Sequence, residues 1–283
     1  MGMNLLASVL AAVVVGTWNG NWFPSGRAEH RAHPDVEAAT ISAAAKMLAS
    51  GLRTVDPEGT NDVILCLNEI RGPRTATNLL AQIGRPGLRL ASISAYRRRD
   101  RFDQQQDVIA TTLPVAESHW SKWKVAKELT PPRGYAYAAV VLDPATTANV
   151  YAVHLKSNYG ATTAKVRAAN REKRTLAIAQ LADQEKRKRG RAPRPVLIAG
   201  DMNADRWSKE FADEKLFGIL EEAGFENPLA LLPSESRGTH PSRTHGDSAL
   251  DYVFCRGVSA AEPPRIIPND ELSDHCAVFV LVR

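Results

Sequence analysis

A carboxylate and an amide stand close together at the end of the apolar run Pro195–Ala199, which continues as Gly-Asp-Met-Asn. Side chains two residues apart on a strand point to the same side, so Asp201 and Asn203 would face one side together if the strand persists. Burying a carboxylate or an amide costs free energy unless the group forms hydrogen bonds or binds a ligand. Carboxylates can bind divalent metal ions or exchange protons with water. The alternative is an ordinary turn, because glycine, aspartate and asparagine all favour turns.

The same pattern recurs at other apolar runs. Three of these runs end in polar groups, namely Val13–Gly16 before Asn19, Val63–Leu67 before Glu69, and Val150–Val153 before His154. Two further runs have their polar groups at the start, with Asp251 near the start of Leu250–Phe254 and with Asp274 and His275 before Cys276–Leu281. If the last two run antiparallel to the others, all these groups lie at one rim. The predicted rim contains Asn19, Glu69, His154, Asp201, Asn203, Asp251, Asp274 and His275.

Six short motifs, each at a predicted strand edge, occur in order from Thr17 to His275. They are TWN, NE followed by IR, HLKSN, GDMN, LDYVF and SDH. Each motif is common alone, but the ordered set resembles the endonuclease/exonuclease/phosphatase superfamily, which has the DNase I-like fold. The chain departs from the family at Asn68, where glutamine is frequent, and its segment Asp103–Asp107 matches none of these motifs. The resemblance implies an α/β (α+β) fold, a four-layer α/β/β/α sandwich of two packed, mostly antiparallel sheets.

The resemblance also implies a chemistry. Hydrolysis of a phosphoester by water needs a divalent metal, a base, an acid for the leaving oxygen, and donors that hold the phosphoryl oxygens. Glu69 is similar to the family's metal ligand, with Asn19 beside it and Asp274 as an additional ligand, and the metal would be Mg²⁺ or Mn²⁺. Asp201 would orient or deprotonate the water, and Asn203 would hold a phosphoryl oxygen. Members of the family differ in the base, so its identity stays open.

Two histidines complete the implied site. Asp251 and His275 resemble an acid–histidine pair, in which the carboxylate fixes the ring tautomer and raises the pKa of the ring. His154 is similar to a second histidine that contacts the scissile phosphate and can serve as the acid. A lone histidine is more often an ordinary polar residue, so these assignments depend on the whole set.

Basic and polar residues near the rim are candidates for substrate binding. Lys156 and Asn158 belong to the HLKSN motif, and Arg71 resembles an arginine that contacts the nucleic-acid backbone in some nucleases of the family. An exposed salt bridge is the alternative for Arg71. A basic loop between two predicted strands, Tyr96–Arg101, adds Arg97, Arg98 and Arg99 and is expected to reach the rim.

Other conspicuous residues have simpler explanations. The basic run Lys186–Arg191 precedes the strand that leads to Asp201, so we expect it at a solvated helix end, roughly 17–20 Å from the rim. His240 and His245 lack further ligands at zinc spacing and are predicted to be loop residues near the rim. The two tryptophans of the first motif region are expected to pack rather than stack on bases; they are Trp18 and Trp22.

The remaining sequence supplies the elements that position the rim. Helices are predicted over Pro34–Gly51, Arg74–Ile83, Thr162–Lys186 and Glu210–Ala223. The third of these would bury Val166, Ala169, Leu176, Ala177 and Leu181. Leu88–Ala95 and Val108–Leu113 are predicted to pair as strands, Tyr135–Leu142 and Asn149–Lys156 to form a hairpin, and Arg256–Pro268 to be a loop with a short strand.

Composition sets broad limits. The chain has 283 residues, 44% of them hydrophobic, and no linker-like segment, so a single domain over residues 1–283 is expected. The apolar run Met1–Val15 is too short to span a membrane and is interpreted as a first strand with an extension, which leaves export or a cytoplasmic location open. Cys66, Cys255 and Cys276 all lie in apolar runs and are expected to be buried thiols, with a Cys255–Cys276 bridge still possible.

The sequence therefore predicts a metal-dependent phosphodiesterase that cleaves DNA or RNA by water attack. The net charge of +5 suits an anionic partner such as nucleic acid. A monomer without stable membrane insertion is expected. Two alternatives stay open: a phosphatase or phospholipid or small-molecule phosphodiesterase of the same superfamily, and a non-catalytic binding protein on this fold.

Overall fold

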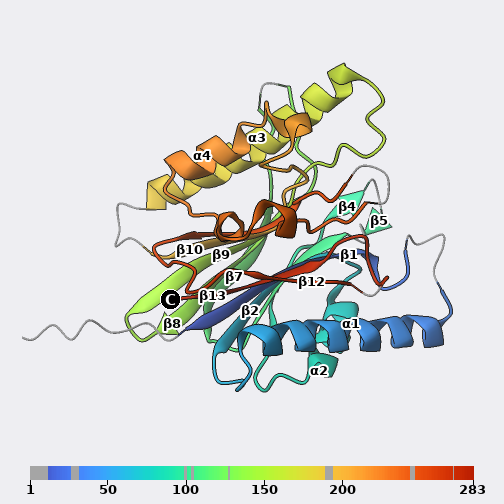
Figure 1. Cartoon of the computed structure of the whole chain (residues 1–283), viewed down its shortest axis with the longest axis vertical. Coiled ribbons are helices and arrows are strands. Elements are labelled where there is room, and N and C mark those ends of the chain that lie inside the picture. Colours follow the sequence, from blue (N-terminus) through green and yellow to red (C-terminus); the bar gives the residue numbers. More distant parts are fainter. Residues whose placement is uncertain are drawn as a thin grey trace, which may run out of the picture.

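The structure is a computed structural model that describes residues 12–26, 32–98, 101–102, 105–126, 128–188, 194–242, 246–269 and 271–283. Two β-sheets pack face to face, with helices on the outer face of each (Figure 1). Helices α1 (Pro34–Val55) and α2 (Pro73–Ile83) cover one sheet. Helices α3 (Ala164–Lys188) and α4 (Leu216–Glu222) cover the other. The predicted four-layer α/β/β/α sandwich is confirmed.

The first sheet has six strands in the order β12-β13-β1-β2-β6-β3. They are β1 (Val13–Phe23), β2 (Asp62–Ile70), β3 (Arg89–Ile93), β6 (Gln106–Thr111), β12 (Arg265–Ile267) and β13 (Ala277–Val282). The central pair β1 and β2 is parallel, and the other pairings are antiparallel. Strands β1 and β2 therefore end at the edge where β13 begins, as predicted.

The second sheet has five strands in the order β11-β10-β9-β8-β7. They are β7 (Val115–Lys122), β8 (Gly134–Asp143), β9 (Thr146–His154), β10 (Val196–Asp201) and β11 (Asp251–Arg256). Strands β9 and β10 are parallel and the rest antiparallel. In this register His154 and Asp251 both lie opposite Asp201. A separate two-stranded ribbon is formed by β4 (Arg97–Arg98) and β5 (Arg101–Phe102).

Strand alternation divides the core into two parts. On β1, Val13 and Val15 join the cluster between the sheets and under α3 and α4, whereas Val14 joins the cluster beneath α1 and α2. Successive side chains of a strand point to opposite faces, so a strand buried on both faces needs a continuous apolar run. This explains why these runs lack the alternation of polar and apolar residues.

Helix α1 continues past its predicted end. Gly51 lies inside the helix, and a Cβ atom there would be 2.2 Å from Phe279 Cε2, so the glycine permits close packing on β13. The helix ends instead at Val55, and the backbone N–H of the next residue, Asp56, donates to the Leu52 carbonyl. The prediction was wrong because glycine can serve close packing as well as helix termination.

The outer helices of the second sheet also differ from the prediction. Helix α3 buries Ala177 and Leu181, but Val166 is 44% exposed and its place on the buried face is taken by Asn170 and Arg174. These polar residues bind main-chain carbonyls of the loop after β9, which the apolar pattern could not indicate. The predicted helix Glu210–Ala223 is split into a 3₁₀ turn at Lys209–Phe211 and the short helix α4. Further 3₁₀ turns lie at Pro228–Leu231 and Ser234–Ser236.

The other predicted elements are present. The β3–β6 pair, the β8–β9 hairpin, helix α2 and the short strand β12 all lie where the sequence placed them. All three cysteines are buried free thiols, and the Cys255–Cys276 bridge is absent because Cys255 lies in the second sheet and Cys276 precedes β13 of the first. Within the described part of the chain, no helix combines the length and apolar character that crossing a membrane requires. Residues 1–11 lie outside the described residues.

Candidate active site

The two sheets are joined at the rim by side chains that converge on Asp201. Asn19 on β1 donates from Nδ2 to Asp201 Oδ2 at 2.9 Å. Asn68 on β2 accepts a hydrogen bond from the backbone N–H of Asp201 at 3.0 Å. The first sheet therefore positions the carboxylate that ends β10 of the second sheet.

Asp201 is a buried carboxylate, and both of its oxygens accept hydrogen bonds. Asn203 donates to it twice, from its backbone N–H to Oδ1 at 2.7 Å and from Nδ2 to Oδ2 at 2.9 Å. Burial raises the pKa of Asp201 to about 6, against the lowering effect of the nearby His275. A carboxyl group with such a pKa can accept a proton from water near neutral pH.

Two of the rim residues have left-handed backbone conformations. Glu69 has φ 59° and Asn203 has φ 50°, values that non-glycine residues rarely adopt. Such conformations cost free energy and persist where the surrounding structure enforces them, often at functional sites. They turn the chain sharply just after β2 and β10 and so help to hold both side chains at the rim.

Asp251 and His275 form the pair that the resemblance implied. His275 Nδ1 lies 2.7 Å from Asp251 Oδ2, and both residues are buried. The Thr239 hydroxyl also donates to Asp251 Oδ2, at 2.8 Å. Burial opposes the charge on His275, but the Asp251 and Asp201 carboxylates outweigh it and raise the pKa of His275 to about 10. The ring is therefore a cation, with Nδ1–H donating to Asp251 and Nε2 3.9 Å from Asp201 Oδ2.

His154 has the opposite electrostatic character. Its Nε2 lies 3.6 Å from Glu69 Oε1 and 3.5 Å from Asp201 Oδ2. Burial, together with the positive charges of Arg133 and His275, holds the pKa of His154 well below its ordinary value. The ring is therefore neutral at the pH where His275 is charged. Its Nδ1 is buried and has no hydrogen-bond partner within the described segments.

The carboxylates at the rim can accommodate a divalent cation. Glu69 Oε2 accepts a hydrogen bond from the Trp22 backbone at 2.9 Å, while Oε1 is directed toward His154. Two other groups bring possible ligand atoms within 4.8 Å of one another, Asp201 with Asp251 and His275, and His240 with Asp274 and His275. Both contain the cationic His275, which would repel a metal ion. Glu69 with Asn19 therefore fits Mg²⁺ better, since this ion takes few carboxylates and keeps several waters.

Asp274 and His240 lie at the outer edge of the site. Asp274 is half exposed, and its carboxylate oxygens lie 3.6 Å from His240 Nε2 and 3.8 Å from His275 Nε2. The His240 and His275 rings pack edge to face with centroids 4.8 Å apart. His240 thus lies near the rim, as predicted, whereas His245 lies outside the described residues.

The expected substrate-binding residues have different surroundings. Lys156 is half-buried and donates to the Ser157 carbonyl, and Asn158 accepts from Arg174. Arg71 forms an ion pair with Glu37 at 2.6 Å, but the two side chains are only 13% and 20% exposed, so the pair is not the exposed salt bridge of the alternative interpretation. Arg97 is exposed on the ribbon; the side chain of Arg98 and all of Arg99 lie outside the described residues.

A buried network behind the rim was missed from the sequence. Asn68 Nδ2 donates to Asp107 Oδ1 at 2.7 Å, and the Tyr96 hydroxyl donates to Asp107 Oδ2 at 2.9 Å. Tyr96 is therefore a core residue and not an exposed loop aromatic. Burial raises the pKa of Asp107 to about 7. A usable signal existed, because Asp107 precedes an apolar run in the same way as Asp251 does.

Arg133 was also missed. Its guanidinium donates to the carbonyls of His154 and Leu155 at 3.2 and 2.9 Å, and to Gln105 Oε1 at 3.1 Å. It therefore fixes the main chain at the end of β9, where His154 enters the site. No pattern in the sequence distinguished this arginine from the others.

Known proteins share the fold of this chain. A family model described as the endonuclease/exonuclease/phosphatase family matches residues 16–275. A search of curated proteins found no match. Among solved structures, the chain is similar to an endonuclease/exonuclease/phosphatase from Beutenbergia cavernae DSM 12333, with a TM-score of 0.64 and 16% identity over 96% of this chain and 72% of that one.

Two structures of D. rerio TDP2 are also similar. A form humanized by 14 mutations has a TM-score of 0.61 and 14% identity over 96% of this chain and 99% of that one. A complex with a single-strand DNA product has a TM-score of 0.60 and 13% identity over the same shares. At such low identities the likeness shows the fold.

Proposed function

The chain belongs to the endonuclease/exonuclease/phosphatase family, and on that premise we propose that it is a divalent-metal-dependent phosphodiesterase that cleaves nucleic acid. The observation that carries the proposal is the convergence of Asp201, the Asp251–His275 pair and His154 at one rim. A non-catalytic binding protein would have no need of two histidines held in opposite charge states beside a buried carboxylate. The solved TDP2 complex with single-strand DNA and the net charge of +5 support nucleic acid as the substrate class.

In the proposed mechanism, Glu69 and Asn19 would hold Mg²⁺ or Mn²⁺, with Asp274 as an additional candidate ligand. When bound, the metal neutralises charge on the phosphate. Asp201 orients the attacking water and accepts its proton, since its pKa is raised to about 6. The His275 cation donates a hydrogen bond from Nε2 to a phosphoryl oxygen. Asp251 accepts the hydrogen bond from Nδ1–H of the same ring.

The remaining groups orient these residues or the substrate. Asn203 directs its amide nitrogen to Asp201 and to the Leu155 carbonyl, so it positions Asp201 in this structure. Contact between Asn203 and a phosphoryl oxygen would replace one of these bonds. His154 lies between Glu69 and Asp201 and is the candidate that protonates the leaving oxygen: its neutral ring would take from Asp201, 3.5 Å away, the proton that Asp201 accepts from water, and would then donate a proton to the leaving oxygen. Lys156, Asn158, Arg71 and Arg97–Arg99 remain candidates for binding the flanking strand.

The first test is metal removal. The protein is dialysed against EDTA and assayed with and without added Mg²⁺ or Mn²⁺ on plasmid, linear duplex, single-strand DNA, RNA and bis(4-nitrophenyl) phosphate. We expect no hydrolysis in EDTA and recovery with either ion, because phosphate charge must be offset. A Glu69→Gln variant should need more metal for half-maximal activity and keep its fold by circular dichroism. Full activity of the stripped protein in EDTA would contradict the mechanism, and hydrolysis of small esters alone would favour the small-molecule alternative.

A further inference from the structure

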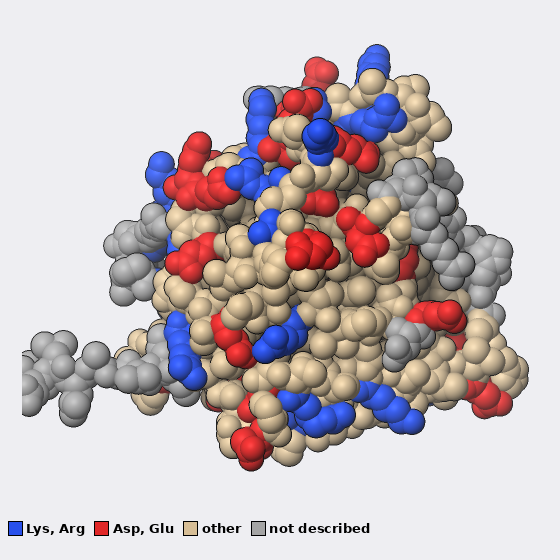
Figure 2. All heavy atoms as spheres, in the orientation of Figure 1, with Lys and Arg blue, Asp and Glu red and all other residues tan. Residues whose placement is uncertain are grey.

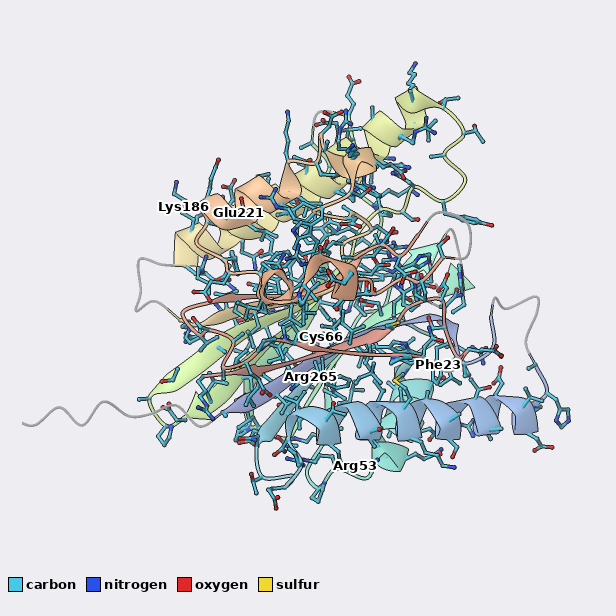
Figure 3. All side chains as sticks on the ribbon, in the orientation of Figure 1. Phe23, Arg53, Cys66, Lys186, Glu221 and Arg265 are labelled. Atoms are coloured by element: carbon cyan, nitrogen blue, oxygen red, sulfur yellow. The ribbon has the colours of Figure 1, made fainter. Side chains whose placement is uncertain are left out.

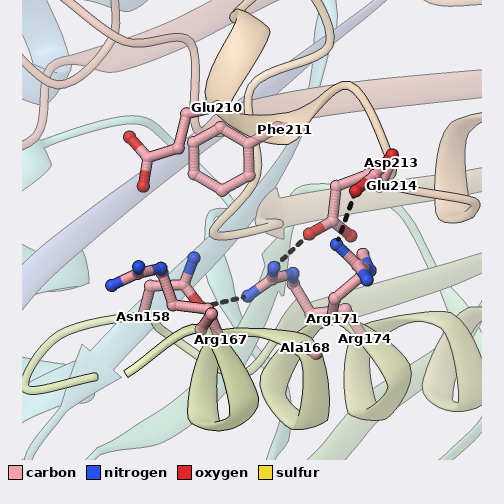
Figure 4. Close-up of a pocket in the computed structure, with 10 residues that line it drawn as sticks. Asn158, Arg167, Ala168, Arg171, Arg174, Glu210, Phe211, Asp213 and Glu214 are labelled. Atoms are coloured by element: carbon pink, nitrogen blue, oxygen red, sulfur yellow. Dashed lines mark hydrogen bonds and ion pairs between the residues drawn. The ribbon is translucent and has the colours of Figure 1, made fainter. Parts of the chain in front are cut away.

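A cavity lies between the first turns of α3 and the stretch that precedes α4, on the helix-covered side of the second sheet (Figure 4). Its volume is about 320 Å³. Three segments line it: Asn158 of the loop after β9, one face of the first turns of α3, and the stretch Glu210–Glu214. None of these lining residues takes part in the chemistry proposed above, except that Asn158 belongs to the HLKSN motif.

Arg174 ties the cavity to the catalytic loop. Its side chain is 1% exposed, donates to the Lys156 carbonyl at 2.7 Å and to Asn158 Oδ1 at 3.3 Å, and pairs with Glu214. Asn170, one turn earlier in α3, donates to the Ser157 carbonyl at 3.1 Å. Asn158 follows His154 by four residues, which is a span of at most about 14 Å. The cavity is therefore held rigidly within reach of the nucleotides that flank a phosphate at the rim.

The charges in the cavity favour a neutral polar occupant over a phosphate. Three arginines are balanced by three acids, namely Arg167, Arg171 and Arg174 against Glu210, Asp213 and Glu214. Arg171 pairs with Asp213 at 3.1 Å, in addition to the buried pair of Arg174 with Glu214. Such a lining offers donors and acceptors side by side, which matches the edge of a nucleobase.

One aromatic ring lines the cavity, and another is exposed on the loop that follows Asn158. Phe211 lines it, with its ring 5.8 Å from the guanidinium carbon of Arg174. Tyr159 is 87% exposed and lies in the loop between Asn158 and Ala161, whose carbonyl accepts from Arg167 at 3.1 Å. An aromatic side chain so fully exposed gains nothing from the core, but it can stack on a base.

We propose that this cavity holds one unstacked nucleobase of a single nucleic-acid strand whose phosphate is at the rim. The inference rests on the proposed function and narrows its substrate class. Tyr159 stacks on the base at the entrance, and Arg167 and Asn158 bind its polar edge. A base within a duplex is paired and stacked, so the cavity selects single strands or unpaired ends.

The test compares a single-strand oligonucleotide with bis(4-nitrophenyl) phosphate, which has no base to place in the cavity. Tyr159→Ala should lower kcat/KM for the oligonucleotide by about 5- to 150-fold, the range of one lost stacking contact. Tyr159→Phe keeps the ring and should resemble the wild type. Arg167→Ala should also lower the value, whereas the matched control Arg187→Ala, at the other end of α3, should not. Hydrolysis of the small ester should be unchanged in all four variants.

Binding is measured separately in EDTA by fluorescence anisotropy, so that the result does not depend on catalysis. We expect weaker binding by Tyr159→Ala and Arg167→Ala, and a loss of affinity when one base near the cleavage position is replaced by an abasic site. Equal binding by wild type and both variants, or equal affinity for intact and abasic strands, would overturn the cavity as a base site. Failure of the wild type to hydrolyse any ester would overturn the proposed function, and the binding data would still decide this inference.

Discussion

At the scale of single residues, the two histidines of the rim are distinguished by their surroundings. His275 has carboxylates on two sides, and the pKa of its ring is raised to about 10. His154 is buried among positive charges, and its pKa lies well below the ordinary value. Groups whose environments separate their pKa values in this way are suited to opposite roles in proton transfer. The cation is suited to stabilise negative charge, and the neutral ring is free to exchange a proton.

The Asp251–His275 pair should act as one unit. We predict that Asp251→Asn and His275→Ala each lower kcat by about 100-fold or more, because each removes the oriented cation. The double variant should be scarcely slower than either single variant, since residues acting together are non-additive. Steady-state kinetics on the small ester would measure this, with circular dichroism to confirm folding. Losses that multiply fully in a folded double variant would show that the residues act separately.

Asp107 should make stability depend on pH. Burial raises the pKa of Asp107 from an ordinary 3.8 to about 7, so the folded protein binds this proton more tightly than the unfolded chain does. Stability contributed by the group is therefore lost as pH rises between these two values. Asp107→Asn cannot titrate, so its free energy of unfolding should change less than that of the wild type between pH 5 and pH 8, by about 2–3 kcal/mol. Urea unfolding at both pH values measures the difference, and parallel changes in the two proteins would contradict the expectation.

At the scale of elements, the close contact of β9, β10 and β2 explains the glycine of the GDMN motif. Gly200 has φ +142°, and a Cβ atom there would be 1.9 Å from the Val153 carbonyl oxygen and 2.9 Å from Asn68 Oδ1. The glycine therefore leaves room for the Asn68 side chain to reach the Asp201 backbone. The last residues of β10 are shaped by packing between strands as well as by their own conformational preferences.

This contact gives a prediction with an internal control. Gly200→Ala should destabilise the protein by roughly 2 kcal/mol or more, because the added methyl group meets main-chain atoms in a strained conformation. Gly218 lies inside α4 with open space around its Cα, and Gly218→Ala should instead stabilise by about 0.5–1 kcal/mol. Urea denaturation of both variants provides the comparison. A Gly200→Ala protein as stable as the wild type would refute the packing argument.

The elements also show what the sequence could and could not predict. The rim was predictable because strand polarity follows from which end of each apolar run has the polar group, as for Glu69 and Asp251. The contacts of Asn68 with Asp107 and Asp201 were not, because they join segments of different strands and sheets. The end of α1 and the split before α4 were missed because Gly51 packs against Phe279 and Glu214 pairs with Arg174 across the fold. The single domain and the roles of the site residues remain predictions.

At the scale of the whole molecule, the basic segments lie at different distances from the rim. Lys186, near the end of α3, and Phe23, at the end of β1, lie on opposite sides of the molecule (Figure 3). The β4–β5 ribbon lies on the same side as the end of β1 (Figure 1). Acidic and basic side chains are interspersed on the face seen in Figure 2, without a broad area of one sign. This face therefore offers no broad basic surface to nucleic acid, and the candidates for attracting it are the local groups near the rim.

The last prediction tests this placement through the salt dependence of DNA binding. Contacts with backbone phosphates release counterions, so each lost contact flattens the slope of log affinity against log salt by about one unit at most. We predict this flattening for Arg97→Ala/Arg98→Ala/Arg99→Ala, with hydrolysis of the small ester nearly unchanged. Lys186→Ala/Arg187→Ala should alter neither property.

Lys188 is left intact in this control, because it pairs with the buried Glu185 at 3.3 Å and its removal would leave a carboxylate without that cation. If the Lys186/Arg187 variant flattens the salt slope and the Arg97/Arg98/Arg99 variant does not, DNA lies along α3. If neither variant changes the salt slope and no polymer is cut, a small or lipid phosphoester replaces nucleic acid as the substrate.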